Sequence, residues 1–274
     1  MNWWTRFSLN IRRRETPFYD RLYRIAHAVR SVSVPVIPGL HSFLYNEREW
    51  RLNAWHNFWR VVYYEPMFKS QCRSVGKNFK LWYAGNGLCG IRGNLQVYIG
   101  DNVATWDNIF LGAPHVYDAP ELHIGSNSIV GPMCRIMVGK EIRIGHYSYI
   151  GTRTFIGDNS GHPVDAGLRL APGAGSPVKE SIRPVTIGDH CFLGQGCYVY
   201  PGAHISDGVF ARAGTHIIGR IPPFCIVAGN PGNVRRLLKI PQAIRELEGE
   251  ERYSEWVAAQ DAFAAENPSV KREE

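Results

Sequence analysis

The sequence lacks several features that would assign a chain of 274 residues to a familiar class at once. It contains no run of about 20 apolar residues that could span a bilayer, and its first stretch, MNWWTRFSLNIRRRE, has no apolar signal-peptide core. The six cysteines are widely spaced and form no Cys-x-x-Cys pair, which excludes a disulfide scaffold and a zinc knuckle. We therefore expect a cytoplasmic protein in a reducing compartment.

The net positive charge of the chain is confined to one segment. Residues 1–80 contain 14 Lys and Arg against 5 Asp and Glu, whereas residues 81–274 contain 17 against 19. Most of the chain therefore offers no general surface for a polyanion. The aromatic residues of the basic segment follow helical spacing, so no nucleic acid partner is expected.

A period of six residues is the strongest pattern, and it extends from about residue 97 to residue 228. Aliphatic residues followed by small or acidic ones recur from Ile99, Ile124, Ile144 and Ile187, where the last run reads IGDHCF, LGQGCY, VYPGAH, ISDGVF, ARAGTH, IIGRIP. An α-helix cannot return a side chain to one face every six residues. Three hexads make a triangular coil of about 18 residues, so about fifteen hexads predict roughly five stacked coils.

The other parts of the chain are predicted to be helical. Apolar and aromatic residues follow helical spacing at residues 17–30 and 47–65, and residues 241–266 predict one amphipathic helix. The expected organisation has three parts, namely a basic, aromatic, amphipathic helical segment (1–80), a β-helix domain (81–239) and a C-terminal helix with a tail (240–274).

Two details of the repeat bear on the site. Cys134, Cys191 and Cys197 occupy the slot that otherwise holds small residues, so we expect them to be core residues. The repeat breaks at residues 163–184, a stretch rich in Gly and Pro. Excursions of this kind usually cover a site or are disordered, and His162 directly before this one favours a site.

These features resemble the hexapeptide-repeat acyltransferase family, in particular its maltose, galactoside and polysaccharide O-acetyltransferase branch. The resemblance is carried by the hexads, by SGHPVD at 160–165, by RPVTIGDHCFLGQGCYVYPG at 183–202 and by IPPFCIVAGNPGNVRRLLK at 221–239. It implies a mainly β fold, a left-handed parallel β-helix, assembled as a homotrimer. It also implies acetyl-CoA, or another acyl-CoA, as co-substrate in a groove between two subunits, and no metal.

The resemblance implies His162 as the general base. An imidazole, with an ordinary pKa of about 6.5, can take the proton of a hydroxyl during its attack on a thioester. Asp165 either orients this ring or is a solvated turn residue. The implied cofactor-binding residues are Ala228, Gly229, Asn230, Pro231, Arg235, Arg236 and Lys239; the three basic ones either meet a phosphate of the cofactor or are solvated charges.

The chain also departs from this branch. Its acceptor-binding Asn, one coil before the base, and its N-terminal acidic residue have no clear counterpart here, so the acceptor is not simply maltose or galactose. We expect a hydroxyl of a saccharide or lipid-linked glycan in envelope polysaccharide synthesis. A non-enzymatic β-helix scaffold or membrane-binding protein is the alternative. A metal-dependent enzyme similar to γ-carbonic anhydrases is a lesser one, since no H-x-x-x-x-H pair occurs.

Two interpretations remain open for residues 1–80. Basic residues beside Trp and Tyr suit a segment lying at the inner face of the cytoplasmic membrane, where lipid-linked glycans are found. The alternative is that the aromatic face caps the β-helix or packs on a neighbouring subunit, because the ends of a solenoid must be covered.

Overall fold

The computed structural model describes residues 2–82, 89–163, 165–170 and 179–273. The chain forms two compact units, Met1–Asn53 and Ala54–Glu274. Its N-terminal helical elements are α1 (Trp3–Arg13), α2 (Pro17–Ser31), α3 (Leu40–Trp59), the π-helical turn η1 (Arg60–Tyr64) and α4 (Glu65–Ser70).

Capping residues explain where the first two helices begin. The side chain of Asn2 accepts the backbone N–H of Thr5 (2.9 Å) at the start of α1. Thr16 caps α2, and Pro17 occupies its first turn, where no N–H is needed. The helix predicted at residues 17–30 is thus confirmed, whereas α1 was not predicted.

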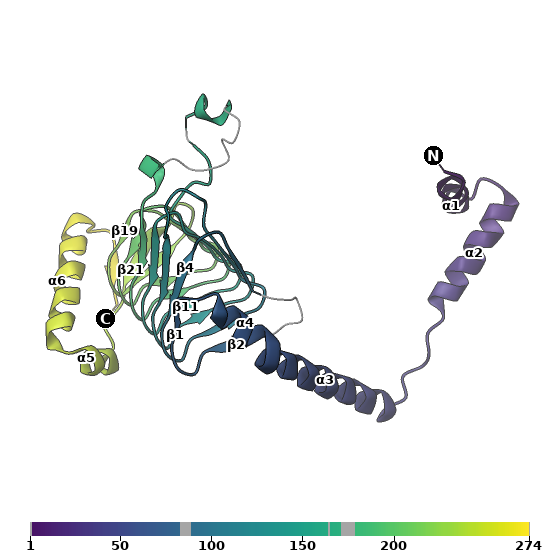
Figure 1. Cartoon of the computed structure of the whole chain (residues 1–274), viewed down its shortest axis with the longest axis horizontal. Helices are drawn as coiled ribbons and strands as arrows, with labels where there is room; N and C mark the ends of the chain where they lie inside the picture. Colours follow the sequence, from purple (N-terminus) through teal and green to yellow (C-terminus); the bar gives the residue numbers. More distant parts are fainter. Residues whose placement is uncertain (1, 83–88, 164, 171–178, 274) are drawn as a thin grey trace. The chain divides into compact units, whose positions relative to one another are not determined.

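The described strands form three sheets that make the sides of a triangular column, and all strand pairs are parallel except the antiparallel pair of β20 and β21 (Figure 1). The first sheet contains β1 (Ser74–Val75), β4 (Gln96–Ile99), β7 (Glu121–Ile124), β10 (Glu141–Ile144), β13 (Val185–Ile187), β16 (His204–Ile205) and β19 (Arg220–Ile221). The second contains β2 (Lys80–Trp82), β5 (Ala104–Trp106), β8 (Ile129–Val130), β11 (Tyr149–Ile150), β14 (Phe192–Leu193), β17 (Phe210–Ala211), β20 (Cys225–Ala228), β21 (Asn233–Leu237) and β22 (Lys271–Arg272). The third contains β3 (Gly90–Arg92), β6 (Phe110–Gly112), β9 (Arg135–Met137), β12 (Phe155–Gly157), β15 (Tyr198–Val199) and β18 (His216–Ile217).

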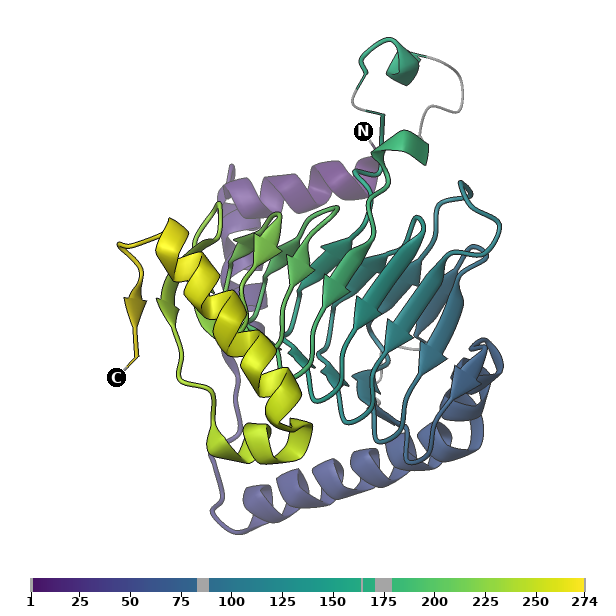
Figure 2. The same cartoon turned by 90° about the vertical axis from the view of Figure 1, so that its left-hand side faces the viewer.

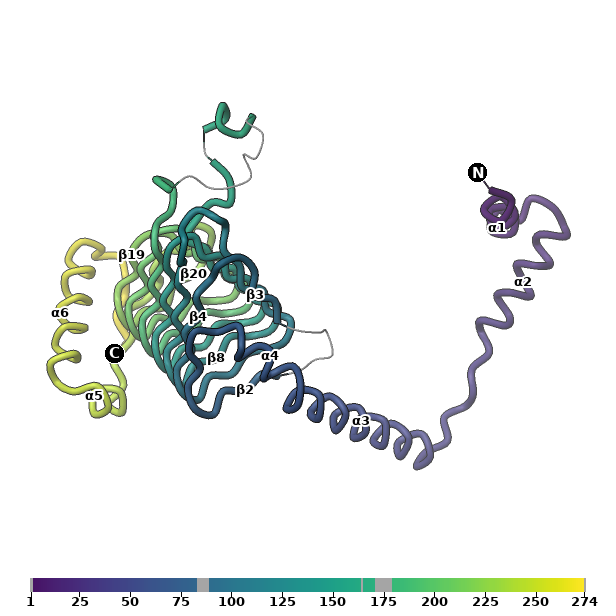
Figure 3. The backbone as a smooth tube through the Cα atoms, viewed as in Figure 1, coloured from purple at the N-terminus to yellow at the C-terminus, as the bar shows by residue number. Residues whose placement is uncertain are grey.

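The predicted fold class, a parallel β-helix of hexapeptide repeats, is confirmed. From β1 to β20, successive strands of the chain belong to different sheets, and the coils stack one behind another (Figure 3). The described strands complete about six turns rather than the predicted five, as the six-stranded third sheet shows. The column has more turns than expected because it begins at β1, ahead of the six-residue repeat recognised from about residue 97 and of the predicted domain start at residue 81.

Aliphatic residues stack on equivalent residues in the core of the column. In the first sheet Ile124 pairs with Ile144, which pairs with Ile187, and all three are buried. Each fully buried isoleucine side chain contributes about 1.5–3 kcal/mol relative to an exposed one. The hexad positions predicted to point inward therefore supply a continuous apolar core.

The predicted core role of Cys134, Cys191 and Cys197 is also confirmed, since all three are buried. Burial raises the pKa of the Cys134 thiol to about 11 and that of Cys191 to about 12. These thiols are consequently kept in the unreactive, protonated form.

The C-terminal region contains two helices, α5 (Gln242–Glu248) and α6 (Glu250–Glu266), which lie beside the last coils (Figure 2). The single helix predicted for residues 241–266 is wrong, because Gly249 adopts a φ of 91° and ends α5. Arg252 of α6 donates to Asp189 (2.6 Å) and to Asp207 (3.1 Å) in two successive coils. This ion pair fixes α6 to the column.

Because neighbouring coils lie close together, replacing a glycine should destabilise the protein only where the next coil would contact the new side chain. A Cβ at Gly145 would lie 2.5 Å from the carbonyl carbon of Gly188 in the next coil. We expect Gly145→Ala to lower the free energy of unfolding by about 1–3 kcal/mol, because the backbone cannot move away. The matched control is Gly90→Ala, since no atom of the described residues lies within 4 Å of that Cβ. Equal unfolding midpoints in urea for the two variants would contradict the prediction.

Candidate functional site

An excursion interrupts the column between β12 and β13, at the corner where the third sheet meets the first. It contains the short 3₁₀ helices η2 (Leu168–Leu170) and η3 (Lys179–Ser181), which project from the column (Figure 2). Part of the predicted loop at 163–184, namely residues 164 and 171–178, lies outside the described residues. The repeat is thus interrupted where the sequence indicated, and the strand before the excursion ends at Gly157.

The neck of the excursion, where the chain leaves and re-enters the column, is closed by Asp158 and Arg183. The backbone N–H of Arg183 donates to the carbonyl of Asp158 (2.8 Å). The buried carboxylate of Asp158 accepts the backbone N–H groups of Gly139, Lys140 (2.6 Å) and Glu141 (3.0 Å) in the preceding coil. Burial raises the pKa of Asp158, while these hydrogen bonds act in the opposite direction. The excursion therefore starts from a fixed point.

His162 lies four residues beyond Asp158, between the neck and η2. Its side chain is exposed, and the ring has no hydrogen-bond partner among the described residues. Its backbone carbonyl accepts the hydroxyl of Ser160 (2.6 Å), and the following Pro163 is buried. An accessible imidazole on a backbone with defined contacts is what a general base requires.

Asp165 makes a turn contact in this structure. Its carboxylate accepts the backbone N–H of Leu168 (3.1 Å) at the start of η2. No hydrogen bond joins Asp165 to His162 within the residues that the structure describes. This contact agrees with the interpretation of Asp165 as a turn residue. A role of Asp165 in orienting the His162 ring stays a prediction.

The predicted cofactor turn follows β20, at the corner between the second and third sheets. It contains Ala228, Gly229, Asn230 and Pro231. Gly229 adopts a φ of 108°, and Asn230 and Pro231 are exposed. The turn is anchored on β18, because the backbone N–H of His216 donates to the Gly229 carbonyl (2.9 Å).

The three predicted basic residues do not all lie at this turn. The Nη2 atom of Arg235 lies 3.2 Å from the place that a Cβ of Gly229 would occupy. Arg236 is exposed on β21, which runs antiparallel to β20 and away from the turn. Lys239 follows the far end of β21, where its backbone N–H donates to Glu273 (3.2 Å). The structure therefore brings Arg235 to the turn and separates Lys239 from it.

The outer face of the third sheet connects the cofactor turn with the neck. Phe155, Tyr198 and His216 pair in register along this face. The rings of Tyr198 and His216 stack at 4.8 Å, and the Tyr200 hydroxyl lies 3.1 Å from Nδ1 of His216. These residues were missed in the sequence, although each of the three paired residues directly precedes an inward aliphatic residue. Outward hexad positions accept most side chains, so an aromatic residue at such a position does not by itself indicate a functional site.

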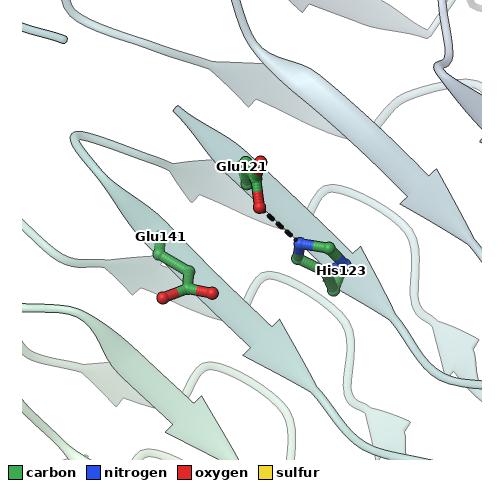
Figure 4. Close-up of side chains that lie close together, drawn as sticks. All are labelled: Glu121, His123 and Glu141. Carbon is green, nitrogen blue, oxygen red and sulfur yellow. Dashed lines mark hydrogen bonds and ion pairs between the residues drawn. The ribbon is translucent and has the colours of Figure 1, made fainter. Parts of the chain in front are cut away.

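The described residues bring together one cluster that could hold a metal ion, on the outer face of the first sheet (Figure 4). Its ligand atoms belong to Glu121, His123 and Glu141 and lie within 4.8 Å of one another. Nε2 of His123 lies 2.9 Å from the Glu121 carboxylate, and Glu141 is paired with Arg143. The Arg143 guanidinium opposes a cation here, and the cluster contains none of the predicted catalytic residues.

A groove of about 580 Å³ extends along the same first sheet. Its lining includes Tyr98, His123, Arg143 and Thr186 together with Arg252 of α6. None of the predicted site residues lies in it. This groove and the predicted site are therefore different places.

Comparisons with known proteins agree with this fold. Residues 184–217 match a family model described as the hexapeptide repeat of succinyl-transferase. The chain is 32% identical over 131 residues to YJL218W of Saccharomyces cerevisiae, whose name assigns it as an acetyltransferase; the match covers 47% of this chain and 63% of that protein. It is 29% identical over 126 residues to the galactoside O-acetyltransferase of Escherichia coli K12, covering 41% of this chain and 62% of that protein.

A solved structure with the same architecture is a variant of AntD, an N-acyltransferase from Bacillus cereus. The two share 23% identity and a TM-score of 0.51 over 69% of this chain and 96% of AntD, a likeness of fold. The chain spans slightly less than two thirds of the length of the two curated relatives, 63% and 62%. The repeat, the relatives and the column thus make the chain similar to hexapeptide-repeat acyltransferases.

Proposed function

We propose that this protein is an acyl-CoA-dependent O-acyltransferase in which His162 is the general base. The observation that carries the proposal is the arrangement along the third sheet. The cofactor turn lies at the corner where the third sheet meets the second. The exposed imidazole of His162 belongs to the excursion after β12, at the corner where the third sheet meets the first. The acetyltransferase names of the relatives support acetyl as the transferred group.

The chemistry needs no acyl-enzyme. The neutral ring of His162 takes the proton of the acceptor hydroxyl while its oxygen attacks the thioester carbonyl. As the tetrahedral intermediate collapses, the C–S bond breaks and the imidazolium returns the proton to the departing thiolate of CoA. The products are an ester and free CoA, and the base is regenerated.

The acceptor in this proposal is a hydroxyl of a saccharide or lipid-linked glycan in envelope polysaccharide synthesis. The galactoside O-acetyltransferase among the relatives supports the saccharide class. We also propose a homotrimer, in which a neighbouring subunit completes the site. In support of this, the groove along the first sheet of one chain does not include His162 among its lining residues.

Removal of the imidazole tests the proposed base. We expect His162→Ala to lower kcat by about 10²–10⁴-fold, the usual contribution of a general base, without changing the melting temperature. The measurement is CoA thiol release from acetyl-CoA with a panel of saccharide acceptors. His204→Ala, which removes another exposed histidine from the column, serves as the matched control. Similar rates for wild type and His162→Ala would refute the assignment.

The positions of the basic residues predict unequal effects on cofactor binding. We expect Arg235→Ala to raise KM for acetyl-CoA about tenfold, because a charge-assisted hydrogen bond to phosphate contributes about 1.5–3 kcal/mol. The same variant should use acetyl-pantetheine, which lacks phosphate, as well as wild type does. Lys239→Ala is the comparison, and its KM should change less. An equal loss with both thioesters would show that Arg235 does not act on the phosphates.

We further propose that residues 1–80 place the enzyme at an anionic membrane surface, on the cytoplasmic side. Trp3 and Trp4 of α1 are 64% and 70% exposed, and the valines of residues 32–37 are also exposed. Arginines accompany them throughout this basic segment. Within the described residues no helix is long and apolar enough to cross a bilayer, so the proposed contact is peripheral.

Vesicle binding tests the membrane contact. The wild-type protein should co-sediment with vesicles containing phosphatidylserine, and less at high salt because the arginine contribution is screened. The double variant Trp3→Ala, Trp4→Ala should bind at least about tenfold more weakly, since it removes apolar area that enters the interface. Leu247→Ala, which removes an exposed apolar side chain of α5, is the control. Unchanged binding of the tryptophan variant would rule out this mode of contact.

A further inference from the structure

Hydrogen bonds connect the buried part of the neck with the residue before His162. Asn159 is buried, and its Nδ2 donates to the carboxylate of Asp158 (2.9 Å) and to the carbonyl of Met137 (3.3 Å). Its Oδ1 accepts the backbone N–H of Gly161 (3.0 Å). The amide of Asn159 thereby uses both its donor and its acceptor groups, which fixes its orientation.

The backbone is also held on the other side of His162. The hydroxyl of Ser160 donates to the His162 carbonyl (2.6 Å). Gly161 adopts a φ of 78°, which other residues reach only with strain, so the turn itself requires glycine. The N–H of Gly161 and the C=O of His162 are consequently both bonded, while the ring stays exposed.

The buried pair of Asp158 and Asn159 differs from the carboxylates that join neighbouring coils elsewhere in the column. Asp101 also accepts a backbone N–H of a neighbouring coil, from Lys77 (2.6 Å), but it is exposed and no excursion follows it. Asp158 is fully buried at the neck, and Asn159 extends its contacts to the turn that carries His162. Burying two polar side chains is unfavourable unless they are fully hydrogen-bonded, as they are here.

We propose that Asp158 and Asn159 are positioning residues that hold the backbone of His162 at a fixed place above the column, so that its ring meets the acceptor hydroxyl in reactive geometry. This inference rests on the proposed function, in which His162 is the base. Neither residue touches substrate; each acts through the turn. A displacement of about 1 Å at a reacting group lowers the rate by about 10²-fold, so such an anchor affects turnover directly.

The test separates kcat from KM. Asn159→Ala should lower kcat about tenfold or more, because the Gly161 contact and the link to Asp158 are lost. Its KM for acetyl-CoA should stay within about twofold, since the cofactor turn lies at another corner of the column. Asn159→Asp keeps the shape and the acceptor for Gly161 but places an oxygen against Asp158 and Met137. We expect this isosteric variant to lose at least as much kcat.

Asp101→Ala is the matched control, with thermal unfolding measured for every variant. It removes a contact of the same kind far from the excursion, so it should lower the melting temperature and leave kcat unchanged. An equal loss of kcat in Asp101→Ala would overturn the inference by showing a general effect of stability. Wild-type kcat in Asn159→Ala beside an inactive His162→Ala would overturn the positioning role alone. An active His162→Ala would instead remove the proposed function.

Discussion

The hydrogen-bonded stacking of parallel strands is the constraint on which the rest of this structure depends. Neighbouring strands of a sheet must lie about 4.8 Å apart, so each coil repeats the position of the last. Ile124, Ile144 and Ile187 therefore superpose in the core, and Gly145 is pressed against Gly188 at a corner. The same spacing lets Asp158 reach three backbone N–H groups of the coil before it.

The part of the fold that could be predicted is the part in which the pattern is local and repeated. Nearly every hexad contains one aliphatic residue that is expected to point into the core, so the column could be predicted from the sequence alone. The first coil was missed although Val75 and Leu81 are six residues apart, because the bulky Phe79 occupies the slot that small residues otherwise hold. The break between α5 and α6 was missed because Gly249 is tolerated within an amphipathic pattern, and only its positive φ shows that the helix ends there.

The candidate site could likewise be predicted only in part. His162 and the turn at residues 228–231 could be predicted as site residues because they lie where the repeat is interrupted or ends. The positioning role proposed for Asn159 could not be predicted, since it depends on contacts with Met137 and Gly161, one of which belongs to another coil. Tyr198 and His216 are likewise adjacent only after the chain has made a full turn. Contacts across coils have no signature within a single hexad.

The closed neck has an evolutionary consequence. Because the Arg183 N–H binds the Asp158 carbonyl, the two ends of the excursion meet, and its length does not alter the register of the coils that follow. The entropy of closing a loop grows only slowly with its length, by about 0.6 kcal/mol per doubling. Insertions and deletions between these two residues are thus inexpensive for the scaffold. The excursion can therefore change in length while the coils on both sides of it keep their register.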